Sequence, residues 1–244
     1  LVGAVPGIID CLTIRGYRAL QSADVVLYDE LISNDIIDLC DTNGLVINVG
    51  KRCGDKKDQV YRQDYINNLI KEYYTLGKYV VRLKGGNPMV FGRGVEEIMF
   101  LIEENIEFEI VPGLTSGLTA AALFNIPITI RGLSSDVIIT SGHNLHTNRK
   151  ESVRRYVEMI NSGTPVIVYM GARVLKDIIK QLTENGIDPS MHIDILSNVA
   201  RNNQRIIHFS LNQWQEIDLT EIELPAVVIM GKYVQPIKEM EEVL

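Results

Sequence analysis

Cysteine is scarce in this sequence, with three residues, Cys11, Cys40 and Cys53, in a chain of 244. They lie far apart without the spacing of metal ligands, and an odd number of cysteines argues against a disulfide framework. We therefore expect no metal site, and a reducing, cytoplasmic setting for the protein.

An excess of positive charge is also missing. Lysine and arginine total 24 against 31 aspartate and glutamate residues, which gives a net charge of −7. A general electrostatic attraction to nucleic acid is therefore disfavoured, because such binding depends on basic surface that neutralises phosphates. Any anionic substrate has to be bound by a local group of basic side chains.

Long apolar runs are absent as well. The longest stretch without charge, residues 111–130, is interrupted by Pro112, Gly113 and Pro127. The apolar helix that remains is too short to span a bilayer of about 30 Å, so we expect a buried core helix there. No signal-peptide pattern of basic, apolar and small residues follows Leu1. We therefore expect no membrane partner.

The sequence also lacks the glycine patterns of common nucleotide sites. Neither G-x-G-x-x-G nor a glycine loop that ends in Gly-Lys-Ser/Thr occurs, which disfavours nicotinamide and nucleotide triphosphates as ligands. What the chain does have is a hydrophobic content of 46%. A chain of this length and composition can bury a substantial core in one large α/β unit or two lobes.

Short runs rich in β-branched residues alternate with helix-length segments in the first half of the chain. One such segment, residues 63–76, repeats apolar residues at helical spacing and stops at Gly77, a favourable helix C-cap. Strands that alternate with helices form a mainly parallel sheet. The predicted strands are residues 25–28, 45–49, 79–83 and 108–111.

The pattern changes after Gly132, where two predicted strands, 193–196 and 205–209, are close in sequence and favour an antiparallel pair. A mixed sheet is therefore expected in this half. Pro112-Gly113 punctuates the chain between the halves, and we expect two α/β lobes, residues 1–112 and 113–244. The other predicted strands of the second half are 136–140, 165–170 and 226–230.

Ligands of parallel α/β sheets bind beyond the carboxyl ends of the strands, so the loops that follow strands carry the functional signal. The small-residue turn 3–7 lets a ligand approach the backbone, or is simply a tight strand-to-helix turn. Asp29 follows the strand 25–28, and Lys51 and Arg52 follow the strand 45–49. Asp29 and Lys51 form either an acid/base pair or an ordinary surface ion pair.

Two further loops are unusual in composition. Residues 82–94 contain four glycines, one proline and three cations, and Lys84 and Arg93 are candidates to meet anionic groups. Residues 111–116 lead into a helix that contains three successive alanines, 120–122. The small side chains leave room for a cofactor, or allow close helix packing.

Taken together, these residues resemble the uroporphyrinogen-III C-methyltransferase branch of the tetrapyrrole methylase family. The match covers nearly the whole chain, and the extended loop with Arg-Leu-Lys-Gly-Gly and Phe-Gly-Arg-Gly is specific for this branch. The motifs that carry the resemblance occur in the shared order 2–7, 23–29, 49–52, 63–67, 82–94, 111–116, 126–129, 140–143 and 169–171.

The resemblance implies a two-lobed α/β fold, with a mainly parallel sheet in the N-terminal lobe, a mixed sheet in the C-terminal lobe and S-adenosyl-L-methionine in the cleft between them. It also implies a homodimer. Asp29 and Lys51 match the family's proposed proton acceptor and donor. The cofactor contacts implied are Pro6, Gly85, Gly86, Asn87, Val90, Thr115, Ser116, Met170 and Val199.

Three positions depart from the family pattern. Val5 replaces a glycine and narrows the approach to the first loop, and Asn87 replaces an aspartate. The segment 198–201 replaces a Gly-Thr segment, which puts the cofactor contact at Val199 in question.

The implied activity is conversion of uroporphyrinogen III to precorrin-2 by two successive methyl transfers, with S-adenosyl-L-homocysteine as the other product, in sirohaem- or cobalamin-type biosynthesis. The substrate's eight carboxylates explain why an acidic chain places Arg52, Lys84, Arg93 and Arg131 in loops at one edge. Two alternatives stay open: a methylase acting on ribosomal RNA or a protein side chain, and a cofactor-binding sensor without catalysis.

Overall fold

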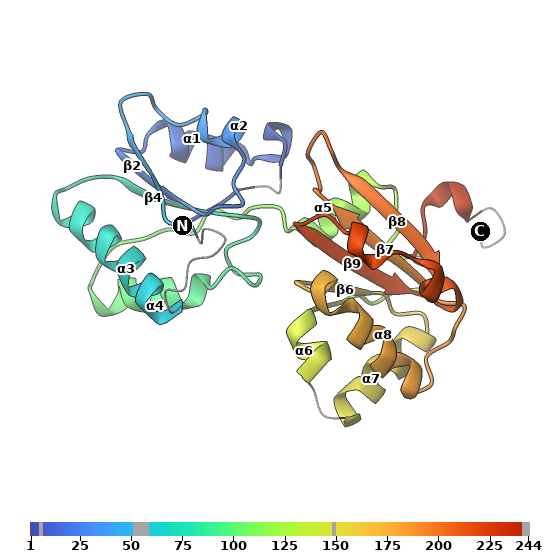
Figure 1. Ribbon diagram of the computed structural model, residues 1–244. Coiled ribbons are helices and arrows are strands. Elements are labelled where there is room, and N and C mark those ends of the chain that lie inside the picture. The colour runs from blue at the N-terminus through green and yellow to red at the C-terminus, as the bar shows by residue number, and fades with distance from the viewer. Residues whose placement is uncertain (5–6, 51–58, 148–149, 241–244) are drawn as a thin grey trace. The chain divides into compact units, whose positions relative to one another are not determined.

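The computed structural model describes residues 1–4, 7–50, 59–147 and 150–240. Its contacts divide the chain into two compact units, Leu1–Thr115 and Ser116–Leu244, whereas the Pro-Gly punctuation predicts a division after Pro112. Each unit is an α/β structure with its own sheet (Figure 1). No helix among the described residues is long and apolar enough to cross a membrane.

The first unit alternates strands and helices along the chain. Its sheet has the order β1-β4-β2-β3, and every pairing in it is parallel, which confirms the predicted mainly parallel sheet. The elements are β1 (Val2–Gly3), η1 (Ile9–Cys11), α1 (Ile14–Gln21), β2 (Val25–Tyr28), α2 (Asn34–Ile37), β3 (Leu45–Asn48), α3 (Gln59–Thr75), β4 (Val80–Lys84) and α4 (Gly94–Glu103).

Helices cover both faces of this sheet (Figure 1). Successive side chains of a strand point to opposite faces, and β2 follows this rule. Val26 packs with Leu20 of α1 and Ile36 of α2, whereas Leu27 packs with Ile66 of α3 and with α4. A strand that is apolar on both faces is the expected signature of a covered parallel sheet.

Local signals set the ends of several helices. Thr13 caps α1, because its Oγ1 accepts a hydrogen bond from the Gly16 amide at 3.0 Å. Helix α3 ends at Thr75 and Gly77 follows with φ of 72°, in agreement with the glycine stop expected from the sequence. The helix begins at Gln59, earlier than the predicted start at residue 63.

The predicted strand 108–111 is wrong. Within it, Val111 alone forms an isolated parallel bridge, with Val2. The other contacts of the segment with residues 1–3 are single hydrogen bonds, among them those from the Leu1 terminal amine to the Glu109 carbonyl oxygen at 2.8 Å and from the Gly3 amide to the Val111 carbonyl oxygen at 2.9 Å. Phe108 is 41% exposed, and the Glu109 side chain points outward to an ion pair with Arg15 at 2.6 Å.

Three glycine backbones converge where β1 and β4 end. A Cβ at Gly3 would lie 2.5 Å from the Gly86 carbonyl oxygen and from the Gly113 nitrogen. A Cβ at Gly113 would lie 2.4 Å from the same Gly86 oxygen. Only glycine fits this close approach, which ties the loop after β4 to residues 111–113.

The second unit has a sheet in the order β5-β6-β9-β7-β8. The β5–β6 pairing is parallel and the remaining pairings are antiparallel, which confirms the mixed sheet and the antiparallel pair β7–β8. The elements are α5 (Ser116–Leu123), β5 (Ile138–Ser141), α6 (Gly142–Thr147), α7 (Lys150–Asn161), β6 (Val166–Tyr169), η2 (Ala172–Val174), α8 (Leu175–Glu184), β7 (His192–Ser197), β8 (Arg205–Ser210), η3 (Leu211–Glu216), η4 (Leu219–Glu221), β9 (Ala226–Gly231) and η5 (Ile237–Glu239).

Helices α6, α7 and α8 lie on one face of this sheet and α5 on the other (Figure 1). The main core is on the first face, where Val157 of α7 and Ile178 of α8 pack with Val166, Ile193 and Val228 of the strands. Helix α5 approaches β6 and β9 closely because it is built from small residues. Gly117 sits against Ile167 of β6.

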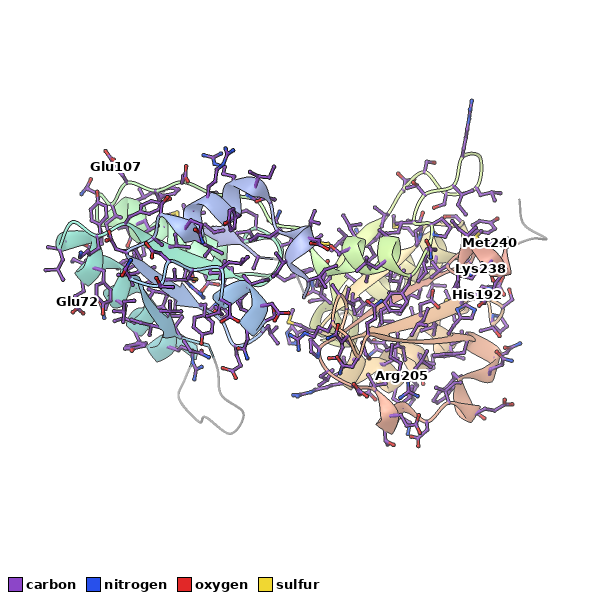
Figure 2. The ribbon with its side chains drawn as sticks, turned by 90° about the horizontal axis from the view of Figure 1, so that it is seen from above. Glu72, Glu107, His192, Arg205, Lys238 and Met240 are labelled. Carbon is purple, nitrogen blue, oxygen red and sulfur yellow. The ribbon has the colours of Figure 1, made fainter. Side chains whose placement is uncertain are left out.

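An unusual polar cluster occupies the sheet between β7 and β8. Asp194, with no exposed surface, hydrogen-bonds Nδ1 of His208, whose Nε2 lies 3.4 Å from Glu239 of η5. The His192 ring stacks on His208 at 5.2 Å. Figure 2 shows His192 beside Lys238 and Met240, where the η5 segment covers this end of the sheet.

Two groups of the cluster, His208 and Asp194, bind protons more tightly in the folded chain. Burial lowers the pKa of His208, but its hydrogen bond to Asp194 and the charges of Asp194 and Glu239 outweigh burial and raise that pKa overall. Burial raises the pKa of Asp194. A raised pKa in either group means that stability falls as pH rises. For His208 this stabilisation is complete below the unfolded pKa of about 6.5 and is lost as pH rises through the higher folded pKa.

We expect His208→Asn to remove part of the pH dependence of stability. The difference in unfolding free energy between wild type and variant should narrow as pH rises from about 6 to above the folded pKa of His208, which is raised. Urea unfolding at a series of pH values measures this difference. His192→Asn is the control, because burial lowers the pKa of His192. An equal narrowing in both variants would contradict the assignment to His208.

Candidate active site

A pocket of about 360 Å³ opens at the carboxyl end of the parallel sheet in the first unit. Strands β2, β3 and β4 point their carboxyl ends toward it, because all three are parallel. This is the edge at which parallel α/β sheets bind ligands. Among the residues that line it are Asp29, Gly50, Lys84, Gly85, Arg93 and Glu97.

Asp29 follows β2 and meets Arg82, which comes from the neighbouring strand β4. Arg82 Nη2 donates a hydrogen bond of 2.5 Å to Asp29 Oδ1, which joins the guanidinium to the carboxylate. The Asp29 side chain is 32% exposed and that of Arg82 only 5%. The acid therefore faces the pocket, while its partner lies beneath it.

Arg82 is fixed at each of its nitrogens. Nη1 donates to the carbonyl oxygens of Leu27 and Leu83 at 3.2 and 3.0 Å, and Nε donates to Glu97 Oε1 at 3.1 Å. Burial lowers the pKa of Arg82, but Asp29 and Glu97 outweigh burial and raise that pKa overall. The guanidinium stays charged and has a single orientation.

Glu97, from α4, is the carboxylate at the centre of the buried charges. Its Oε1 accepts from Lys84 Nζ at 2.8 Å and from Gln63 Nε2 at 3.4 Å, in addition to Arg82. Glu97 is 1% exposed and Lys84 3%. Burial, and then the charge of Arg82, lower the pKa of Lys84, although Glu97 opposes this. The sequence predicts that Lys84 contacts anionic groups, whereas the structure shows its side chain buried inside the protein.

Arg93 lies at the pocket and is exposed. Its Nε donates to Glu96 Oε2 at 2.8 Å, one turn into α4. Arg93 has a φ of 55°, and Phe91 two residues earlier a φ of 53°. Left-handed backbone at non-glycine residues is costly and gathers at ligand-binding loops.

The two glycines after β4 have different surroundings. A Cβ at Gly85 would have one neighbour within 4 Å, Leu31 Cβ at 3.9 Å, so Gly85 leaves open space in the pocket. Gly86 has a φ of 74°, and its carbonyl packs against Gly3 and Gly113. Gly85 therefore provides room for a ligand, and Gly86 provides the backbone turn.

Asn87 uses its side chain to form the loop. Asn87 Oδ1 accepts a hydrogen bond from the Met89 amide at 2.9 Å, and its carbonyl accepts from the Val90 amide at 3.1 Å. Asparagine and aspartate both make this local turn. Val90 is half-buried in the same loop.

In the second unit, Met170 and Val199 emerge at one edge of the sheet. Tyr169 of β6 and Leu196 of β7 are both paired with Val227 of β9, so the segments that follow these strands leave the sheet at the same level. Met170 is 64% exposed with a φ of 55°. Val199 is buried between two left-handed residues, Asn198 and Ala200.

Ser116 belongs to the same part of the second unit. The amide of the next residue, Gly117, donates to the Tyr169 hydroxyl at 2.6 Å, which places the start of α5 beside the end of β6. Ser116 and the preceding Thr115 are half-buried. Arg131 is exposed, in a turn of the second unit. Pro6, Lys51, Arg52 and Val5 lie outside the described residues.

Sequence reasoning missed Arg82 and Glu97 as members of the site. A signal was present, because β4 places two charged residues, Arg82 and Lys84, at alternate positions of a strand that is otherwise Val and Leu. Charges on a buried strand need a buried partner. Glu97 could not be chosen over Glu96 without knowledge of which side of α4 faces the sheet.

Solved structures with the same fold include methyltransferases that are named for tetrapyrrole substrates. A cobalt precorrin-4 methyltransferase superimposes with a TM-score of 0.81 at 22% identity, with 96% of each chain covered, which shows the fold alone. A uroporphyrin-III C-methyltransferase from Thermus thermophilus, complexed with S-adenyl homocysteine, has a TM-score of 0.75 at 30% identity, over 95% of this chain and 97% of that one.

The sequence comparisons are more specific. The model of the family Tetrapyrrole (Corrin/Porphyrin) Methylases matches residues 1–215. The uroporphyrinogen-III C-methyltransferase of Priestia megaterium is 36% identical over 96% of this chain and 97% of the relative. That of Methanocaldococcus jannaschii is 35% identical over 96% and 95%. This chain belongs to the tetrapyrrole methylase family.

Proposed function

We propose that the protein is an S-adenosyl-L-methionine-dependent C-methyltransferase that converts uroporphyrinogen III to precorrin-2 by two successive methyl transfers. The names of relatives at 35–36% identity over nearly the whole chain support this activity. The product would enter sirohaem- or cobalamin-type biosynthesis. The observation that carries the proposal is the pocket of the first unit, where Asp29 faces the opening with Arg82 fixed beneath it.

The cofactor supplies a methyl group on a sulfonium, which an electron-rich pyrrole carbon accepts without further activation. The protein then has two tasks, to align the carbon and to take up the proton that is lost. Asp29 is the proposed proton acceptor, because its carboxylate pairs with the Arg82 guanidinium and is open to the pocket. Lys51 is the proposed donor, and follows Gly50, which lines the same pocket.

The structure offers positions suited to the proposed cofactor in both units. In the first, Gly85 leaves open space, and Gly86, Asn87 and Val90 are half-buried in the loop that follows it. In the second, Met170 and Ala200 have left-handed backbone, and Ser116 begins a small-residue helix. Backbone groups held in such conformations are typical of ligand contacts. Pro6, Thr115 and Val199 complete the proposed set.

The carboxylates of the tetrapyrrole need cations, and Arg52, Arg93 and Arg131 are the proposed contacts. Arg93 is exposed at the pocket, held by Glu96 without being buried. A guanidinium in this state can bind a carboxylate in the bidentate geometry that arginine favours. Lys84 is also a proposed substrate-binding residue. Because its side chain is buried, it is proposed to act through its charge and through its contact with Glu97.

Homodimerisation is proposed from an apolar stripe on α4. Val95, Met99 and Ile102 recur at helical spacing and are each more than half exposed, at 57, 51 and 54%. Contiguous exposed apolar surface on a helix favours a protein partner. A cytoplasmic location is proposed because Cys11 and Cys40 are free thiols, as is common in reducing compartments.

The proposed function is tested by binding and turnover with the purified protein. We expect S-adenosyl-L-methionine and S-adenosyl-L-homocysteine to bind with comparable affinity by calorimetry, because most proposed contacts reach atoms common to both ligands. Uroporphyrinogen III should then be methylated twice when the methyl donor is present. Failure of both ligands to bind would exclude the methyltransferase, and binding without turnover would favour the sensor alternative.

Asp29→Ala and Lys51→Ala should lower the rate of methyl transfer far more than they weaken cofactor binding. The loss of a positioned proton-transfer group costs on the order of 10²–10⁴ in rate. Initial rates and calorimetry with S-adenosyl-L-homocysteine separate the two effects. A rate change below about tenfold in Asp29→Ala would mean that its pair with Arg82 is an ordinary ion pair.

Asn87→Asp should be tolerated, although it restores the aspartate of the family pattern. Asn87 uses its side-chain oxygen to bind the Met89 amide, and a carboxylate oxygen can replace it. We expect the Kd of S-adenosyl-L-homocysteine to change by less than about tenfold, roughly 1.4 kcal/mol. A hundredfold tightening would instead identify the side-chain charge as a principal cofactor contact.

A further inference from the structure

Glu97 is not among the residues to which the proposed function assigns a task, yet it contacts the residues of the site from within. Its Oε1 accepts from Arg82 Nε at 3.1 Å and from Lys84 Nζ at 2.8 Å. Both cations point to the same face of β4, because they are two residues apart on a strand. All three side chains are at least 95% buried.

A buried charge cluster of this kind is a poor means of stabilising a fold. Removing each ion from water is unfavourable, and apolar residues of similar volume often replace such clusters with no loss of stability. The other side chains of β4 that pack on the sheet faces, Val81 and Leu83, are apolar and fully buried. Core packing alone therefore gives no reason for Arg82, Lys84 and Glu97.

The geometry supplies a reason, because Glu97 completes the fixation of Arg82. A guanidinium is planar, so its orientation is determined once Nε and Nη1 are both bound. Glu97 binds Nε, and the Leu27 and Leu83 carbonyls bind Nη1. The remaining nitrogen, Nη2, is then directed at Asp29 Oδ1. Without Glu97 the guanidinium could rotate about the bonds of its side chain.

We infer that Glu97 is a positioning residue of the methyl-transfer site, which acts on Asp29 through Arg82 and holds Lys84 as the second cation of the cluster. The inference rests on the proposed function. Glu97 does not touch the reacting atoms, so its removal should lower the turnover rate and leave the binding of both ligands intact.

One oxygen of the Glu97 carboxylate is further evidence that the cluster is not arranged for stability. Glu97 Oε2 is buried and has no hydrogen-bond partner among the residues that the structure describes, whereas Oε1 has three. A buried acceptor without a partner destabilises the folded state, because it loses the hydrogen bonds it would make in water. Such a cost is expected where a side chain is placed for the sake of the groups it orients.

The test is a double-mutant cycle of Glu97→Gln and Arg82→Gln in the full chain. Glutamine keeps the shape of Glu97 and removes its charge. Rates are measured with uroporphyrinogen III and S-adenosyl-L-methionine, and are expressed per site that binds S-adenosyl-L-homocysteine, so that any unfolded fraction is excluded. Glu103→Gln is the matched control, because Glu103 is an exposed glutamate on the same helix.

We expect kcat of Glu97→Gln to fall on the order of 10², the scale of a misplaced catalytic group, with KM and the cofactor Kd within about threefold of wild type. The double variant should be no slower than Arg82→Gln alone, because residues that act as a unit are not additive. Glu97→Asp, which keeps the charge, should recover part of kcat. Glu103→Gln should match wild type.

Two results would overturn the inference. One is a kcat of Glu97→Gln within about threefold of wild type, and the other is a double variant whose loss is the product of the single losses. If Glu97→Gln does not fold, Glu97→Asp and Arg82→Lys form the cycle, and a double variant whose loss is the product of the single losses overturns the inference. Absence of turnover by the wild type would instead reject the proposed function, so the two failures are distinguishable.

Discussion

Arg82 joins two carboxylates that the chain brings from different elements, Asp29 after β2 and Glu97 on α4. This contact is possible only because β4 is the inner neighbour of β2 in a parallel sheet, with Leu27 opposite Arg82. The strand order, the pocket at the carboxyl edge and the helix that follows the glycine loop all have to be in place before the three side chains meet. The site is thus a consequence of the sheet topology rather than of any one loop.

The same topology explains which features could be predicted from the sequence. Strand β2 was predicted with its observed ends because an apolar run is followed by polar residues at the point where the sheet stops. The mixed sheet of the second unit followed from the short connection between β7 and β8. The position of Asp29 at a ligand-binding edge needed only the rule that parallel strands end together.

Other features depend on contacts between distant residues. The segment 108–111 has strand composition, but strand formation needs a paired neighbour, and Val111 alone of this segment bridges to β1. Lys84 has the composition of an anion contact, yet it is buried because Glu97, thirteen residues later, faces it. Composition gives the charge of a side chain; the packing of α4 against β4 decides whether that charge meets a ligand or another residue.

The departures from the family pattern that the structure describes fall where backbone geometry matters most. Asn87 forms a turn that aspartate also forms, through the same oxygen position. Val199 buries its side chain, while Asn198 and Ala200 on either side adopt left-handed backbone. A left-handed alanine is costly and persists only when its surroundings impose it, and here the Ala200 amide is bound by Gln204. The loop conformation is therefore maintained by a local hydrogen bond, without the glycine of the family pattern.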